Sequence, residues 1–151
     1  YHIQAQDKLS YKSLESFNND TINYLKYNFY TLRSQYEGKT IADVIKNLKL
    51  TVIEASPISL VNINEDNKSD SKPIETVGIQ LIVSDEIHID VSFDKPVNSK
   101  EYSEAITSGN GTKSFKMTTK LYNFLKDKKV KSVYTNPIAL EQVKQLRKNN
   151  N

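Results

Sequence analysis

Apolar residues stand at every second position in two stretches near the middle of the chain, residues 77–83 and residues 87–93. This alternation is typical of strands that bury one face. Ser84 and Asp85 lie between the stretches and indicate a turn, so we predict that the two strands pair as an antiparallel hairpin. Shorter apolar runs predict further strands at residues 50–55 and 58–63, on either side of Pro57, and at residues 131–135.

Before this region the spacing of apolar residues is helical. One face of a long helix, predicted over residues 13–35, carries Leu14, Ile22, Leu25, Phe29, Leu32 and Tyr36. Gly38 is placed to end this helix. A second helix is predicted to begin after Thr40, because Asp43 follows it at the spacing of a capping box.

The C-terminal part predicts two more helices. One covers residues 113–126, and the other begins after Asn136, an N-capping residue followed by Pro137 at the first helical position. Residues 65–72 are polar and residues 95–113 are rich in turn formers, so both are predicted to be loops.

Helices at the two ends of the chain around a run of strands predict an α+β fold. We expect an antiparallel sheet of about four to five strands packed against a long N-terminal helix and C-terminal helices. This order of elements resembles that of cystatin-like and nuclear-transport-factor-like folds, and such a resemblance implies no function. Residues 13–148 are predicted to form the domain, with a flexible segment at residues 1–12 and a frayed tail at residues 149–151.

Composition excludes several classes of protein. The 151 residues are 37% hydrophobic and 26% charged, which suits one globular domain and not a disordered chain. The net charge of +3 is small and only Arg33 and Arg147 are arginine, so we expect no nucleic-acid partner. No stretch approaches the length of apolar chain needed to span a membrane.

The chain contains no cysteine. This excludes disulfides, zinc–thiolate sites and thiol nucleophiles, and it suits a bacterial protein outside the cytoplasm. Ala5 is placed like the last residue of a signal-peptide cleavage region. The sequence therefore predicts a secreted or periplasmic protein, with a signal-peptide remnant in the flexible segment at residues 1–12.

His88 is the residue of the chain best suited by its chemistry to catalysis or metal binding. Glu86, His88 and Asp90 are two apart, so a strand would place them on one face, where they could form a metal site or a base with an orienting acid. A metal site usually needs a second histidine, and the chain's other one is His2. We therefore expect no metal and no cofactor, and we interpret these residues first as a solvated strand face.

Residues 108–114 read SGNGTKS, a sequence similar to a phosphate-binding loop. The Walker pattern requires glycine directly before the lysine, where Thr112 stands, so the segment is interpreted as a flexible turn.

A basic run follows at Lys126, Lys128, Lys129 and Lys131. Cations at the C-terminal end of a helix offset its dipole, and this run contains neither arginine nor aromatic residues for stacking on a polyanion.

Tyr24, Tyr27 and Tyr30 are the strongest candidates for a binding surface. At about 100° per residue they leave the apolar face of the long helix and pass around its opposite side. Tyrosine is enriched at interfaces, although packing within the chain would also explain these rings. We therefore expect a non-catalytic binding or interaction module whose first helix contacts a protein, a glycan or a second copy. The alternative is a small enzyme, or a protein with a small-ligand pocket, that uses the face around His88.

Overall fold

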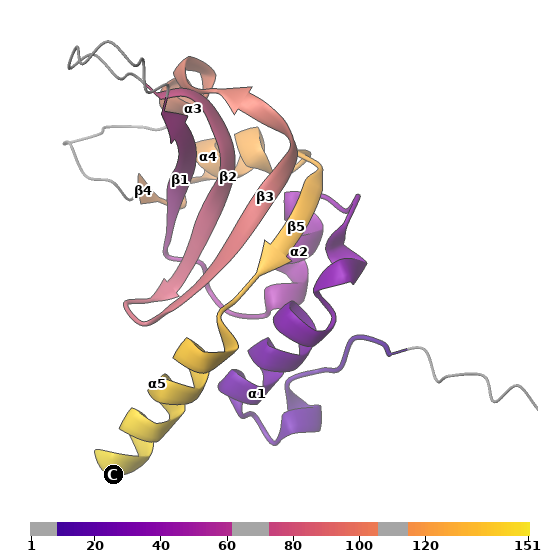
Figure 1. Ribbon diagram of the computed structural model, residues 1–151, viewed down its shortest axis with the longest axis vertical. Helices are drawn as coiled ribbons and strands as arrows, with labels where there is room; N and C mark the ends of the chain where they lie inside the picture. Colours follow the sequence, from indigo (N-terminus) through magenta and orange to yellow (C-terminus); the bar gives the residue numbers. More distant parts are fainter. Residues whose placement is uncertain (1–8, 62–72, 106–114) are drawn as a thin grey trace, which may run out of the picture.

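The protein forms one antiparallel sheet, with helices α2 and α4 behind it and α5 at one end (Figure 1). The structure, a computed structural model, describes residues 9–61, 73–105 and 115–151. Within these residues the strand order is β4-β1-β2-β3-β5, and every neighbouring pair is antiparallel. The α+β class with an antiparallel sheet is therefore confirmed. The strands are β1 (Glu54–Val61), β2 (Pro73–Ser84), β3 (Ile87–Asn98), β4 (Phe115–Lys116) and β5 (Val130–Tyr134).

The helical elements fall before, between and after the strands. They are the 3₁₀-helix η1 (Glu15–Phe17), α1 (Thr21–Leu25), the π-helix η2 (Lys26–Thr31), the 3₁₀-helix η3 (Arg33–Tyr36), α2 (Ile41–Leu48), α3 (Ser99–Ala105), α4 (Thr119–Leu125) and α5 (Pro137–Asn149). No helix within the described ranges is long and apolar enough to cross a bilayer.

The predicted hairpin is confirmed as β2 and β3, which pair across a two-residue turn. Ile79 lies opposite Val91 and Leu81 opposite Ile89, and all four side chains are buried on the face that packs against the helices. The alternation in the sequence thus marks the inner face of the sheet correctly.

The two strands predicted around Pro57 are a single strand, β1, which runs through the proline. Proline has no N–H to donate, so it is tolerated in a strand where one side lacks a partner. In the described residues β4 pairs only with Glu54 and Ala55, which leaves Pro57 on an edge.

The prediction of one long helix over residues 13–35 is wrong. The chain instead forms η1, turns, and continues as the short elements α1, η2 and η3. Asn18 and Asn19 have φ of 52° and 59°, in the left-handed region, and the Asp20 side chain accepts a hydrogen bond from the Asn23 N–H as the N-cap of α1. This turn removes the long helix on which the resemblance to cystatin-like folds rested. Gly38, with φ of 76°, ends the helical region as predicted.

Two predicted helix starts are confirmed in atomic detail. Thr40 and Asp43 form a reciprocal capping box at α2, and the Asn136 side chain accepts hydrogen bonds from two backbone N–H groups at the start of α5, with Pro137 at the first position. The helix predicted over residues 113–126 starts later, at α4, where Thr118 is the N-cap.

The loop predicted over residues 95–113 is also corrected in part. β3 continues to Asn98, and α3 follows directly. Residues 106–114, and the loop predicted at residues 65–72, lie outside the described part of the chain.

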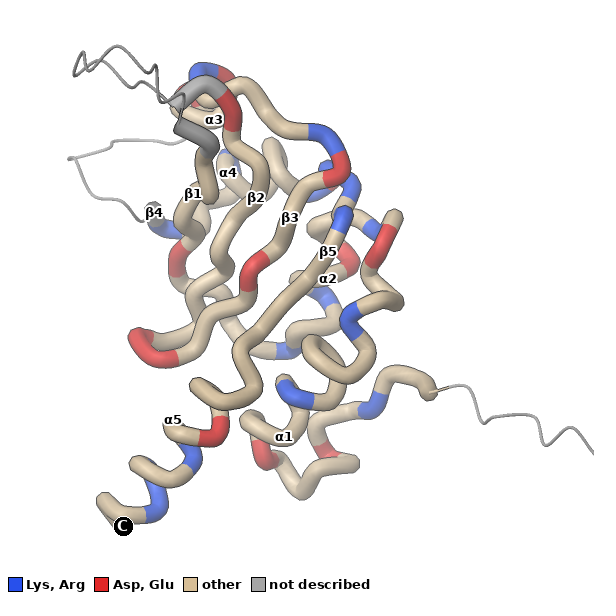
Figure 2. Tube along the Cα trace, viewed as in Figure 1, with Lys and Arg blue, Asp and Glu red and all other residues tan. Residues whose placement is uncertain are grey.

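Helix α5 contacts the rest of the protein near α1 and η2. Leu140 and Val143 are its buried side chains. Two ion pairs of 3.1 Å, Lys26–Glu141 and Lys144–Asp20, also join α5 to η2 and to the residue that caps α1. Charged residues occur along the whole length of α5 (Figure 2). The hydrogen bond from Lys26 holds the pKa of the Glu141 carboxyl below its ordinary value.

Candidate functional site

The three tyrosines of the candidate surface lie in different environments. Tyr24 is fully buried; its hydroxyl is 2.8 Å from that of Tyr11 and also donates to the backbone carbonyl of Asn47. Burial, followed by the hydrogen bond with Tyr11, raises the pKa of the Tyr24 hydroxyl above its ordinary value. Tyr24 is thus a core residue, and its assignment to a partner surface is corrected.

Tyr27 is half-buried against the N-terminal segment of its own chain. Its hydroxyl donates to the carbonyl of Ser10 at 3.0 Å, and the Lys12 ammonium lies 4.8 Å from the centre of its ring. The Phe17 ring packs on it with centroids 5.6 Å apart. The hydroxyl and the ring of Tyr27 are therefore both in contact with residues of the same chain.

Tyr30 lies beside the sheet, at strand β5. Its half-buried ring meets the Tyr134 ring edge to face, with centroids 6.2 Å apart. The Arg33 guanidinium lies 4.6 Å from the centre of the Tyr30 ring, and its Nη1 donates to the Tyr30 carbonyl at 2.7 Å. These contacts bring Tyr30, Arg33 and Tyr134 together into one cluster, which we call the Tyr30–Arg33–Tyr134 cluster.

A groove of about 360 Å³ adjoins this cluster, between η3 and β5. Its lining consists of Arg33, Ser34, Glu37, Lys131, Ser132, Val133 and Tyr134. Tyr134 is 45% exposed, and Arg33 and Lys131 are exposed as well. The ion pairs found within the described ranges join Lys26 to Glu141 and Lys144 to Asp20, so neither Arg33 nor Lys131 is paired with an acidic side chain there.

The sequence contains Tyr30, Arg33 and Tyr134 but does not reveal that they meet. Tyr134 is identified only as part of a predicted strand, and the neighbours of that strand depend on the tertiary fold.

The residues proposed around His88 are not assembled into a site. Glu86 lies in the hairpin turn, His88 is exposed on the outer face of β3, and Asp90 accepts a hydrogen bond from Gln80 at 2.9 Å. In the described part of the chain no hydrogen bond or ion pair joins His88 to either acid, and no three potential metal-ligating residues come together.

We predict that His88 binds no metal ion tightly, because Asp90 is hydrogen-bonded to Gln80 and Glu86 lies in the hairpin turn. Calorimetric titration with zinc, iron(II) and nickel should detect no site tighter than micromolar. A tight site with one ion per chain that disappears in His88→Ala would contradict this and favour the enzyme alternative.

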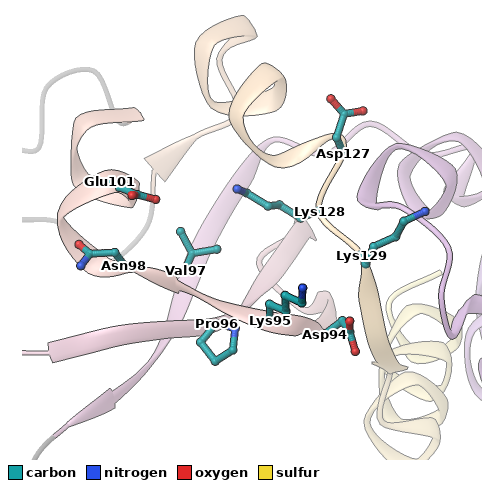
Figure 3. A pocket seen from close by; sticks show the side chains of 9 residues that line it. All are labelled: Asp94, Lys95, Pro96, Val97, Asn98, Glu101, Asp127, Lys128 and Lys129. Carbon is teal, nitrogen blue, oxygen red and sulfur yellow. The ribbon is translucent and has the colours of Figure 1, made fainter.

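Three of the four lysines in the basic run line two separate hollows. Lys131 lines the groove at β5, whereas Lys128 and Lys129 line a larger cleft of about 550 Å³, where their side chains point to opposite sides (Figure 3). Lys128 also lies over the Phe124 ring, 4.7 Å from its centre. Three acidic residues line the same cleft as three lysines, so its charge does not favour a polyanion. The SGNGTKS segment lies outside the described residues.

No protein-family model, curated protein or solved structure matches this chain. Among the described residues, the Tyr30–Arg33–Tyr134 cluster has the most specific arrangement of side chains.

Proposed function

We propose that this chain is a non-catalytic binding module, and that the groove at the Tyr30–Arg33–Tyr134 cluster holds a carboxylate side chain of a partner protein. The observation that supports this most directly is the set of groups that surround the Arg33 guanidinium. Its guanidinium is held by the Tyr30 ring and the Tyr30 carbonyl, but it forms no ion pair with an acidic side chain of the described ranges.

The geometry of arginine explains the choice of ligand. A guanidinium presents several N–H donors in one plane and binds a carboxylate through two parallel hydrogen bonds. Because Nη1 already donates to the Tyr30 carbonyl, the side chain loses little conformational freedom when a carboxylate approaches its remaining N–H groups. Lys131 adds a second positive charge in the same groove.

The two tyrosines complete a surface suited to a protein partner. Tyrosine and arginine are the residue types that most often dominate the binding energy of protein interfaces. The exposed part of Tyr134 can pack on apolar groups next to the bound carboxylate, while its hydroxyl stays in water. Glu37 also lines the groove, so its charged side chains are two cations, Arg33 and Lys131, and one anion, and the net positive charge favours one carboxylate.

The cellular location is part of the proposal. We infer that the protein is secreted or periplasmic and bacterial, and the support for this is the absence of cysteine from all 151 residues. Recovery of the chain in the cytoplasmic fraction of its source cells would contradict this location.

The proposal can be tested with peptides selected from a random display library on the immobilised protein. We expect the selected peptides to contain Asp or Glu, and Arg33→Ala to weaken their binding about tenfold or more, as for the loss of a hydrogen-bonded charge. Tyr134→Ser should also weaken binding. Both side chains are at least partly exposed, so thermal unfolding should change little.

The chain's other arginine, Arg147, provides the control. It lies exposed in the last turn of α5, so Arg147→Ala removes the same charge at another place. Peptides that lack acidic residues, or that bind the Arg33→Ala and Arg147→Ala variants equally well, would contradict the proposal.

A further inference from the structure

Residues 9–12 lie against the first helical region as an extended peptide lies in a binding groove. Side chains of that region bond to their backbone: Gln35 Nε2 donates to the Leu9 carbonyl at 2.7 Å, and the Tyr27 hydroxyl to the Ser10 carbonyl at 3.0 Å. Buried Asn28 makes two bonds to Lys12, accepting from its N–H at 3.1 Å and donating to its carbonyl at 2.9 Å. We call residues 9–12 the N-terminal strap and these helical side chains the strap groove.

Only one side chain of the strap is inserted into the protein. Leu9, Ser10 and Lys12 are exposed, whereas Tyr11 is half-buried. The Tyr11 ring meets the Tyr24 ring edge to face at 6.2 Å and borders a cavity of about 190 Å³. Hydrogen bonds to the backbone with one pocketed side chain are the general chemistry by which proteins bind extended segments.

The strap reaches its groove through a strained turn. Asn18 and Asn19 lie in the sequence between the strap and the residues of the strap groove. Both have a left-handed backbone conformation, and neither has the conformational freedom of glycine. The left-handed conformation is unfavourable for residues with a Cβ, although asparagine tolerates it best. The turn residues favour the break, but the helical spacing of apolar residues continues across it from Leu14 to Ile22, so the apolar pattern is also compatible with a straight connection.

We propose that the N-terminal strap exchanges between two copies of the chain. The turn at Asn18 and Asn19 opens, and the strap of each copy occupies the strap groove of the other, which gives a symmetric dimer. Every contact of the strap is kept in this dimer, while the left-handed turn is released; short strained hinges favour such exchange. The proposal uses none of the contacts at the Tyr30–Arg33–Tyr134 cluster and does not depend on it.

Two opposite substitutions at the hinge test the exchange. Asn18→Gly with Asn19→Gly makes the turn easier, whereas Asn18→Ala with Asn19→Ala makes it harder. Four hinge residues change in each dimer, so we expect the alanine pair to raise the dimer association constant on the order of a hundredfold and the glycine pair to lower it. Sedimentation equilibrium of the full chain up to millimolar concentration measures both, and circular dichroism checks that each variant is folded.

Two further variants separate exchange from other self-association. Asn28→Ala added to the alanine pair removes the anchor of the strap, so the protein should return to a monomer. Arg33→Ala added to the same pair should leave the dimer intact, which distinguishes this proposal from the one at the groove of β5. If the alanine pair stays monomeric, or associates no more strongly than the glycine pair, the exchange proposal is wrong. Asn19→Ala alone, expected to give an intermediate constant, decides the question if the double variant fails to fold.

Discussion

Replacing Tyr24 with alanine should lower the free energy of unfolding by about 3–5 kcal/mol, as for other buried aromatic residues. Tyr24 is among the largest fully buried side chains and packs edge to face with the rings of Tyr11, Phe17 and Phe29. Removing it opens a cavity between the first helical region and α2, and it leaves the Asn47 carbonyl without the hydroxyl that now donates to it. Urea unfolding followed by circular dichroism measures the change.

Two comparisons make this prediction specific. Tyr24→Phe keeps the ring and loses only the hydroxyl, so it should cost about 1–2 kcal/mol. Tyr30→Ala removes an equal side chain that is only half-buried and should cost about 1 kcal/mol. An equal loss in Tyr24→Ala and Tyr30→Ala would contradict the distinction between a core tyrosine and a surface tyrosine.

Gly78→Ala should destabilise the protein by about 3 kcal/mol, at the upper end of the usual cost of overpacking. A Cβ at this position would lie 2.4 Å from the carbonyl oxygen of Val91 and 3.1 Å from the Cα of Ser92. Both are backbone atoms of the paired strand β3, so relief requires β2 and β3 to separate and not merely a side chain to rotate. Chemical denaturation measures the loss.

Gly38 is the control for this substitution. It has φ of 76°, but a Cβ there meets no atom within 4 Å. Gly38→Ala should therefore cost only the backbone strain of a left-handed alanine, about 1 kcal/mol, and Gly38→Asn less. A Gly78→Ala variant as stable as the wild type would show that the hairpin accommodates the added methyl group.

The parts of the fold that were predictable have local causes. The caps at Thr40 and Asn136 depend on residues within one turn of the helix, and the hairpin depends on alternation across a two-residue turn. The predicted long helix does not form, because local turn chemistry overrides the helical spacing of the apolar residues. Asn18 and Asn19 tolerate left-handed geometry and Asp20 is an N-capping residue, so the break could have been anticipated from the sequence.

The candidate site was less predictable, for geometric reasons. The angles expected for Tyr24, Tyr27 and Tyr30 are those of an α-helix, whereas residues 26–31 form a π-helix, whose wider turn advances by a smaller angle per residue. The contact of the N-terminal segment with Tyr27 is a tertiary contact that helical spacing does not encode. The position of Tyr30 beside Tyr134 depends on the packing of β5 against η2 and η3, which no local pattern encodes.

The attachment of α5 has a consequence for how the molecule opens. This helix is held by two buried apolar side chains and two partly exposed ion pairs, and exposed ion pairs contribute little and are screened by salt. Because the pKa of Glu141 is lowered in the folded state, its contribution is present near neutral pH and is lost as the pH falls through the acid range. The amides of α5 should thus exchange with solvent by a local opening that leaves the sheet folded, and rising salt or acidity should increase that opening before it affects global unfolding.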